Sequence, residues 1–196
     1  MRTAAKDSPT KEKLLRAAQD LVLARGFSGT TVDDICKSAR LTKGSFFHYF
    51  KGKEDLGRQL LEQYCGTSKA SFASGCCSEE KDPLKRIYGF LDFVIAKQKG
   101  GRGKGCLLGC MAQELADTDP VIRSMCSKAF EAMGGLLEKD LREAKKKYGA
   151  DVDPVALARH FVVVLEGSML VARVGGGARG AGLEHYKAYL RALFGR

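Results

Sequence analysis

Residues 30 to 50 constrain the fold of this chain more than any other segment. Thr31 is followed three residues later by Asp34, a pairing typical of a helix start, and apolar residues then recur on one helical face for two turns. After a turn around Arg40, Thr42 is placed to cap a second short helix. We therefore predict two short helices around a tight turn, and no other segment carries so many mutually consistent signals.

The rest of the chain is predicted to be helical as well. Helical periodicity runs through it, whereas no convincing period-two alternation of polar and apolar residues occurs. Four helices are expected to open on a capping residue followed by proline, at Ser8-Pro9, Asp82-Pro83, Asp119-Pro120 and Asp153-Pro154. We predict an all-α fold of about nine helices: three at the N-terminus, a fourth from about Glu54, and five beyond residue 80. Gly134-Gly135 is expected to kink the long helix that begins at Pro120.

Charge and cysteine content limit the class of protein. The chain has 33 Lys and Arg against 23 Asp and Glu, a net charge of +10, and such basic proteins favour polyanions such as nucleic acid or anionic lipid. No run of 18 apolar residues occurs and residues 1 to 9 lack the apolar core of a signal peptide, so we expect a cytoplasmic protein without a membrane partner. The seven cysteines are irregularly spaced and show no zinc-binding pattern. We predict no metal and no cofactor.

Several stretches near the N-terminus share their order and spacing with a known family. They are Gly26-Phe27, Thr30-Thr31-Val32, the run from Thr42 to Phe50, and Lys53-Glu54-Asp55-Leu56. Over roughly residues 10 to 60 the chain resembles the TetR family of one-component bacterial transcriptional regulators. The resemblance implies a helix-turn-helix DNA-binding domain over residues 1–55 and an effector-binding and dimerisation domain over residues 56–196.

The same resemblance implies a function. It predicts a homodimeric regulator, most simply a repressor, that binds a palindromic operator in double-stranded DNA. A small-molecule effector of unknown identity would release the operator. No catalytic residues are expected.

Residues at the start of the second short helix suit contact with DNA. A recognition helix enters the major groove by its N-terminal end, so side chains there must be short, polar or cationic. Thr42, Lys43, Gly44 and Ser45 meet this requirement. Lys43 can donate to guanine or phosphate, Gly44 lets the backbone come close, and Ser45 can donate or accept.

Further contacts follow from the resemblance to the family. By position, Tyr49 and Lys53 resemble phosphate clamps, which fix register without reading sequence. Thr30 and Thr31 resemble contacts to the DNA backbone, and His48 resembles a further contact in the groove.

Two residues depart from the family pattern. Arg40 stands in the turn where members commonly have glycine, so a positive φ angle there would cost about 1 kcal/mol. Either the turn adjusts, or Arg40 reaches a phosphate. Phe47 stands where the family often has tyrosine, and phenylalanine cannot donate a hydrogen bond to phosphate. We therefore expect Phe47 to make only an apolar contact to a sugar or a thymine methyl group.

The segment beyond residue 80 is expected to bind the effector and to form the dimer. The pocket residues are predicted from the placement of aromatic, methionine and cysteine side chains, each of which core packing would also explain: Tyr88, Phe90, Phe93, Cys106, Cys110, Met111, Met125, Phe130 and Phe161. The resemblance implies that the last two long helices pair with their symmetry mates, and Gly167, Ser168 and Ala172 are small enough for a close crossing. Packing within one chain is the alternative for these helices.

Two other functions stay open on the sequence alone. Cys106 and Cys110 lie four residues apart on one predicted helical face, after Lys99, Arg102 and Lys104, so a reactive thiol gating DNA binding is one alternative to small hydrophobic packing. The other is a nucleotide-binding enzyme, because residues 175 to 180 satisfy a G-x-G-x-x-G string. That string lacks the βαβ context and the later acidic residue of a dinucleotide site.

Overall fold

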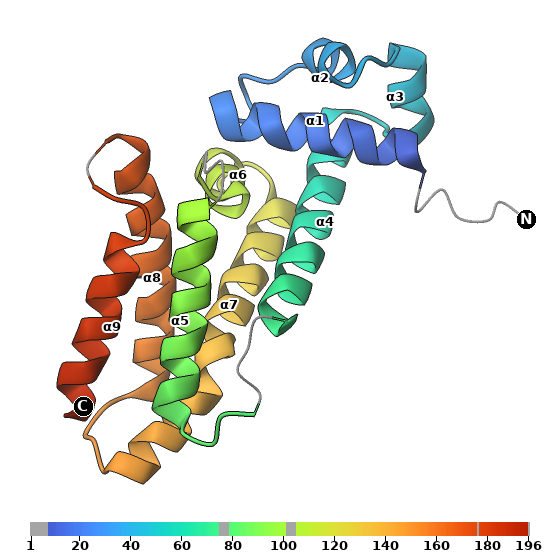
Figure 1. Ribbon diagram of the computed structural model, residues 1–196. Helices are drawn as coiled ribbons and strands as arrows, with labels where there is room; N and C mark the ends of the chain where they lie inside the picture. The colour runs from blue at the N-terminus through green and yellow to red at the C-terminus, as the bar shows by residue number, and fades with distance from the viewer. Residues whose placement is uncertain (1–7, 75–78, 101–104, 176, 196) are drawn as a thin grey trace, which may run out of the picture. The chain divides into compact units, whose positions relative to one another are not determined.

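The computed structural model describes residues 8–74, 79–100, 105–175 and 177–195, and gives the backbone alone between 68 and 74. Nine helices and no strand occur in these ranges, which confirms the predicted all-α fold (Figure 1). The helices are α1 Pro9–Arg25, α2 Val32–Ala39, α3 Lys43–Tyr49, α4 Lys53–Ser74, α5 Pro83–Gly100, α6 Leu107–Leu115, α7 Pro120–Tyr148, α8 Pro154–Arg173 and α9 Ala181–Phe194.

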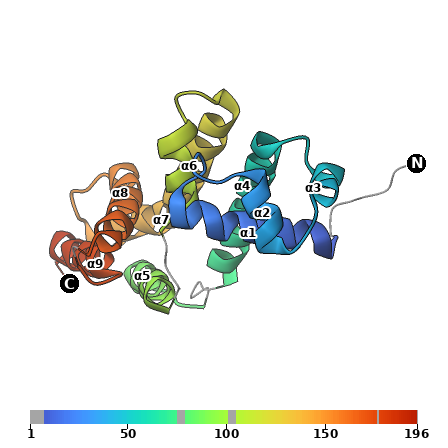
Figure 2. The same ribbon diagram turned by 90° about the horizontal axis from the view of Figure 1, so that it is seen from above.

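The first of two compact units contains residues up to 68 together with residues 106–126. In this unit α2, α3 and α6 all pack against α1, and α2 also contacts α3 (Figure 2). Each of these helices, and α4, contributes buried apolar side chains, among them Leu14, Ile35, Phe46, Leu56 and Met111. The short helices α2 and α3 are thus held by packing on longer neighbours, because helices of seven or eight residues are marginal alone.

The second unit contains residues 69–105 and 127–196. In it α8 and α5 both pack against α9, and the core draws on α5, α7, α8 and α9, as with Leu91, Leu141, Phe161 and Leu190. Lys187 of α9 is buried, and its ammonium donates to both carboxylate oxygens of Asp92 at 2.5 and 2.6 Å. A buried ammonium requires such a partner, because an unpaired charge in the interior is strongly destabilising.

Small residues bring helices of the second unit close together. α7 continues through Gly134 and Gly135 without interruption, and a Cβ added at Gly134 would lie 3.3 Å from the carbonyl oxygen of Ala158 in α8. A Cβ added at Gly182 in α9 would lie 2.6 Å from Cβ of Ser168 in α8. Ser168 therefore makes its close crossing with α9 of the same chain, whereas Gly167 faces open space.

Candidate nucleic-acid interface

Local hydrogen bonds hold α2 and α3 around their turn. Thr31 and Asp34 form a complete capping box, with the Asp34 amide donating to the Thr31 hydroxyl at 3.2 Å and the Thr31 amide to the Asp34 carboxylate at 3.1 Å. The Thr42 hydroxyl caps α3 by accepting from the Ser45 amide at 3.2 Å. The hydrogen bonds from Thr31 also lower the pKa of Asp34. The predicted caps are thus present, and they set where each helix begins.

The N-terminal end of α3 presents a polar surface to solvent. Thr42, Lys43, Gly44 and His48 are exposed, while Ser45 is partly covered. The ammonium of Lys43 pairs with Asp33 of α2 at 2.7 Å, and this hydrogen bond raises the pKa of Lys43. The four residues predicted to read DNA thus lie together at one end of α3, and they are Thr42, Lys43, Gly44 and Ser45.

Phe46 and Phe47 divide α3 into a buried and an exposed side. Phe46 is fully buried, and its ring lies 5.2 Å from that of Phe47, measured between centroids. Phe47 itself is 58% exposed, although its phenyl ring forms no hydrogen bonds with water. Its position beside the polar helix end suits the apolar contact predicted for it.

Two predicted phosphate contacts, Tyr49 and Lys53, already have partners in the unbound protein. The Tyr49 hydroxyl lies 2.8 Å from the hydroxyl of Ser8, the residue that precedes α1. The Lys53 ammonium donates to the carbonyl oxygen of Phe27 at 2.9 Å and lies 4.6 Å from the centre of the Phe27 ring. Both side chains are thus held in place, and a phosphate contact by Lys53 would have to share or replace these interactions.

Thr30 lies in the interior rather than on the surface. Its side chain is 1% exposed, and its hydroxyl donates to the carbonyl oxygen of Gly26 at 2.8 Å. A hydroxyl used in this way secures the turn before α2 and has no access to a phosphate from this position. We therefore leave Thr30 out of the proposed contact surface and keep its exposed neighbour Thr31.

Glu114 of α6 is a part of this region that the local sequence patterns did not indicate. Its carboxylate accepts hydrogen bonds from the amides of Phe27 at 2.8 Å and Ser28 at 2.7 Å. Burial works against the charged carboxylate, but these two backbone donors prevail and lower the pKa of Glu114. A Cβ added at Gly26 would lie only 2.6 Å from a Glu114 oxygen, and Gly26 has a φ of 87°, so the close approach and the backbone conformation both favour glycine.

Comparison with known proteins identifies the family. The family model described as "Bacterial regulatory proteins, tetR family" matches residues 14–60, and the one described as "Tetracyclin repressor-like, C-terminal domain" matches residues 83–182. The transcriptional regulator AcuR of Cereibacter sphaeroides is 31% identical over 83% of this chain and 76% of its own. The chain belongs to the TetR family of bacterial regulatory proteins.

Solved structures of TetR-family members share the fold of the whole chain. A regulatory protein TetR from Rhodobacter sphaeroides superposes with a TM-score of 0.80 at 30% identity, covering 96% of this chain and 98% of its own. The reduced form of NemR from E. coli has a TM-score of 0.80 at 26% identity, covering 95% and 97%. As a TetR-family member the protein is a DNA-binding transcriptional regulator and not an enzyme. Gly175 and residues 177–180 of the glycine string lie between α8 and α9, and the described residues contain no strand that could form a βαβ unit.

The nine residues predicted from the sequence to bind the effector belong to both compact units. Cys106, Cys110, Met111 and Met125 belong to the first unit, and Tyr88, Phe90, Phe93, Phe130 and Phe161 to the second. Phe90 and Phe161 are core residues whose rings meet edge to face, with centroids 5.8 Å apart. The effector role of these nine residues stays a prediction.

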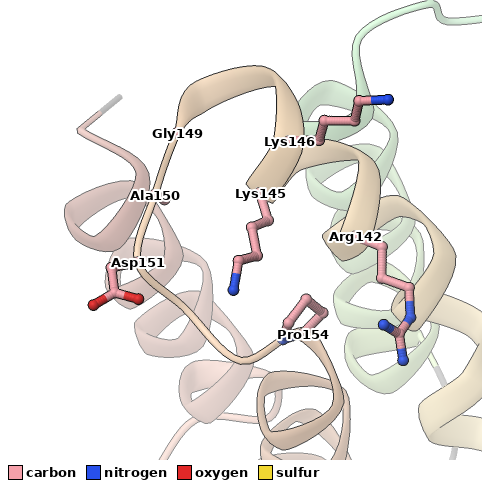
Figure 3. A pocket seen from close by; sticks show the side chains of 7 residues that line it. All are labelled: Arg142, Lys145, Lys146, Gly149, Ala150, Asp151 and Pro154. Atoms are coloured by element: carbon pink, nitrogen blue, oxygen red, sulfur yellow. The ribbon is translucent and has the colours of Figure 1, made fainter.

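A hollow that was not predicted lies at the end of α7 (Figure 3). Its volume is about 590 Å³, and it is lined by Arg142, Lys145, Lys146, Gly149, Ala150, Asp151 and Pro154. Two of its cations have protein partners, because Lys145 donates to the carbonyl oxygen of Val152 at 2.8 Å and Arg142 to Glu138 at 2.7 Å. These contacts stabilise the end of α7 and the loop that follows, and the hollow shares no residue with the predicted effector set.

Cys106 and Cys126 are both candidates for a reactive thiol, and both are buried. Cys106 is the residue that precedes α6; it is 7% exposed, and its sulfur lies 3.8 Å from the Tyr64 hydroxyl. Burial raises the pKa of Cys126 to about 11, which makes that thiol unreactive near neutral pH. Of the cations predicted to activate Cys106, Arg102 and Lys104 lie outside the described residues.

Proposed function

We propose that the protein is a repressor that binds a palindromic operator as a homodimer and releases it when a small-molecule effector binds. The proposal is carried by the exposed N-terminal end of α3, where Thr42, Lys43, Gly44 and Ser45 lie together beside Phe47. Curated relatives support the repressor assignment, among them the HTH-type transcriptional repressor NemR of Escherichia coli (strain K12), 27% identical over 84% of each chain. Such a protein acts in the cytoplasm, where the operator is.

Gly44 has no structural reason to be glycine. A Cβ added there would meet only the Thr42 hydroxyl oxygen, at an ordinary contact distance of 3.7 Å. The backbone angle does not demand glycine either, because Gly44 is not among the residues with positive φ. A missing side chain on an exposed helix end suits the close approach of a DNA backbone.

The proposed dimer surface is an apolar stripe on α8 and its neighbour on α9. On α8 the stripe contains Val163, Gly167, Leu170 and Val171, which share one face of the helix, and Val174 directly follows the helix end. Val163 and Leu170 are 69% and 53% exposed. On α9, His185, Ala188, Tyr189 and Ala192 are exposed and likewise share one face of the helix. Exposed apolar surface of this extent in a soluble protein marks an interface, and a second copy of the same two helices is the proposed partner.

The effector would act by shifting the protein between two conformations. A ligand that binds better to one conformation increases its population, and the operator is released if the recognition helices in that conformation no longer match successive major grooves. The aromatic residues Tyr88, Phe90, Phe93 and Phe161 are the proposed contacts from the second unit. Alanine substitution of Phe93, which only borders the core, tests the contact with less risk to folding than substitution of buried Phe161.

Selection from a randomised duplex library tests the DNA-binding proposal. The wild-type protein is expected to enrich a palindromic duplex, and a Lys43→Ala, Ser45→Ala variant to lose that preference while keeping weak binding to all duplexes. Enrichment of the same palindrome by both proteins would show that the α3 residues do not read the operator.

Gating by a thiol is a second candidate function. It is favoured by the position of Cys106 at the start of α6, where a helix N-terminus stabilises a thiolate, and by the solved NemR relative, which is described as a reduced form. Release of the operator by an electrophile such as N-ethylmaleimide is expected to disappear in Cys106→Ser and to persist in Cys126→Ser. A Cys106→Ser protein that still responds fully would rule this candidate out.

A further inference from the structure

Arg40 adopts a backbone conformation that disfavours every residue except glycine and a few polar ones. It ends α2 in the left-handed region, with φ 55° and ψ 46°, and among the described residues it is the only non-glycine with positive φ. The turn therefore has not adjusted to the arginine. Arg40 donates its amide to the Lys37 carbonyl oxygen, and the next amide, of Leu41, donates to Cys36. Glycine would make the same cap without strain.

No interaction within the described protein offsets this strain. The Arg40 side chain is exposed and has no hydrogen bond, ion pair or ring contact in the described part of the chain. The carboxylates of α2 are already occupied, because Asp33 pairs with Lys43 at 2.7 Å and Asp34 with Arg25 at 2.5 Å. The guanidinium is therefore available to an external acceptor.

The position of Arg40 points to a DNA phosphate as that acceptor. Arg40 lies two residues before Thr42, the cap of α3, so the two Cα atoms are at most about 7.6 Å apart. A duplex that takes the start of α3 into its major groove must bring the phosphates at the edge of the groove to this turn. Residues held in strained backbone conformations gather at binding sites, where the bound partner makes use of the side chain.

We propose that Arg40 contacts an operator phosphate and helps to fix the register of α3 in the groove. This proposal rests on the proposed DNA-binding function. A guanidinium donates two parallel hydrogen bonds to one phosphate, which neither glycine nor asparagine can do. Arg40 thus acts as a positioning residue, and strain in the unbound protein accompanies a contact that forms only with DNA.

Substitution by glycine separates the strain from the contact, because the two have opposite effects. Arg40→Gly is expected to raise the melting temperature of the full-length protein by about 2 to 4 °C, since the left-handed conformation suits glycine. The same variant is expected to bind a duplex selected by the wild-type protein about tenfold more weakly. Its plot of log affinity against log salt is expected to be shallower by about 0.9 per protomer. Arg40→Lys is expected to keep the melting temperature and the salt dependence of the wild type.

Lys13→Gln serves as the control for loss of one charge. Lys13 is exposed on α1 in the same compact unit, and no interface role is assigned to it. The proposal is overturned if Arg40→Gly binds the selected duplex with wild-type affinity and salt dependence, or if Lys13→Gln loses as much as Arg40→Gly. If the wild-type protein selects no duplex at all, the DNA-binding proposal fails and the Arg40 contact fails with it.

Discussion

The carboxylate of Glu114 shows how a single residue holds a backbone turn in place. Two amide groups, of Phe27 and Ser28, point at it, and the carbonyl oxygens of the same two residues face the Lys53 ammonium at 2.9 and 3.5 Å. The turn between α1 and α2 is thus bound on one side by an anion and on the other by a cation. Charge-assisted hydrogen bonds of this kind are about twice as strong as neutral ones.

Glu114→Gln is expected to destabilise the protein at pH 7 by about 1 to 3 kcal/mol, because the glutamine NH2 group would face a backbone donor. The pKa of Glu114 is lowered by folding, so its contribution is complete above the ordinary glutamate pKa of about 4.3 and is lost as the pH falls through the folded value. Urea unfolding of both proteins at pH 7 and below pH 4 measures this. A difference in unfolding free energy that stays the same at both pH values would contradict a role for the charge.

Gly44→Ala is expected to separate folding from function. The added methyl group has space, and alanine is favoured over glycine within a helix by up to about 1 kcal/mol, so the melting temperature should be unchanged or higher. Affinity for the selected duplex should fall, because the methyl group keeps the DNA backbone away. Anisotropy titration and thermal unfolding of the same samples measure both effects, and unchanged affinity would remove Gly44 from the interface.

At the scale of helices, the features that the sequence predicts are those determined by residues a few positions away along the chain. The starts of α1, α2, α3, α5, α7 and α8 follow from a capping residue or a proline one to three positions away, and the structure confirms these starts. Ser8 is the exception among the predicted caps, because α1 begins at Pro9 without a capping hydrogen bond from the Ser8 side chain. The sequence did not reveal the contacts of Glu114 or Lys53, because they join residues 87 and 26 positions apart along the chain. Burial of Thr30 was missed for a similar reason. Its sequence neighbour Thr31 is exposed, and only the packed unit distinguishes the two.

The start of α7 combines a cap with an ion pair. Asp119 accepts from the amides of Val121 and Ile122 at 2.9 and 3.1 Å, and from the Arg58 guanidinium of α4 at 2.9 Å. The bond from Arg58 lowers the pKa of Asp119. One side chain therefore both caps α7 and ties it to α4 within the first unit.

Asp119→Ala is expected to lower the free energy of unfolding by about 2 kcal/mol, from loss of the cap and of a charged partner for Arg58. Asp153→Ala is the matched comparison, because Asp153 caps α8 before a proline in the same way and has no ion pair in the described structure. It should cost about 1 kcal/mol. Chemical denaturation of both variants tests the difference, and equal losses would show that the Arg58 pair adds nothing.

At the scale of the whole molecule, the exposed apolar surface of α8 is compared with two roles, a membrane span and a helix of the dimer interface. It is long and apolar enough to cross a membrane by length and composition, and only 22% of its most apolar stretch is buried. A span would be apolar all round, whereas Arg159, Glu166 and Arg173 interrupt this helix and its exposed apolar residues form one stripe. A stripe on one side fits a paired helix better than a lipid-exposed one.

Leu170→Glu is expected to convert the proposed dimer to a monomer, since it places a carboxylate in the centre of the proposed α8 stripe. Val121→Glu is the control, because Val121 is a similarly exposed apolar residue, 47% against 53%, outside the stripe. Sedimentation velocity should give a halved mass for Leu170→Glu alone. Wild-type protein that sediments as a monomer, or a dimer that tolerates Leu170→Glu, would contradict the proposed interface.

Most of the net positive charge lies in the second compact unit and not in the unit that contains α3. The first compact unit has 13 basic and 11 acidic residues, a net charge of +2, and the second has 20 and 12, a net charge of +8. The total of +10 therefore says little about where DNA binds. We therefore propose that affinity for the operator depends on the side chains at the start of α3 rather than on the total charge.

Binding of the wild-type protein to its selected palindrome, measured for stoichiometry and salt dependence together, tests the proposed function most directly. Two protomers are expected per palindromic duplex, with affinity that falls steeply between about 50 and 200 mM salt and is at least about 10³-fold weaker on an unrelated duplex. One protomer per duplex, or equal affinity for the palindrome and the unrelated duplex, would contradict an operator-binding dimer that reads DNA through α3.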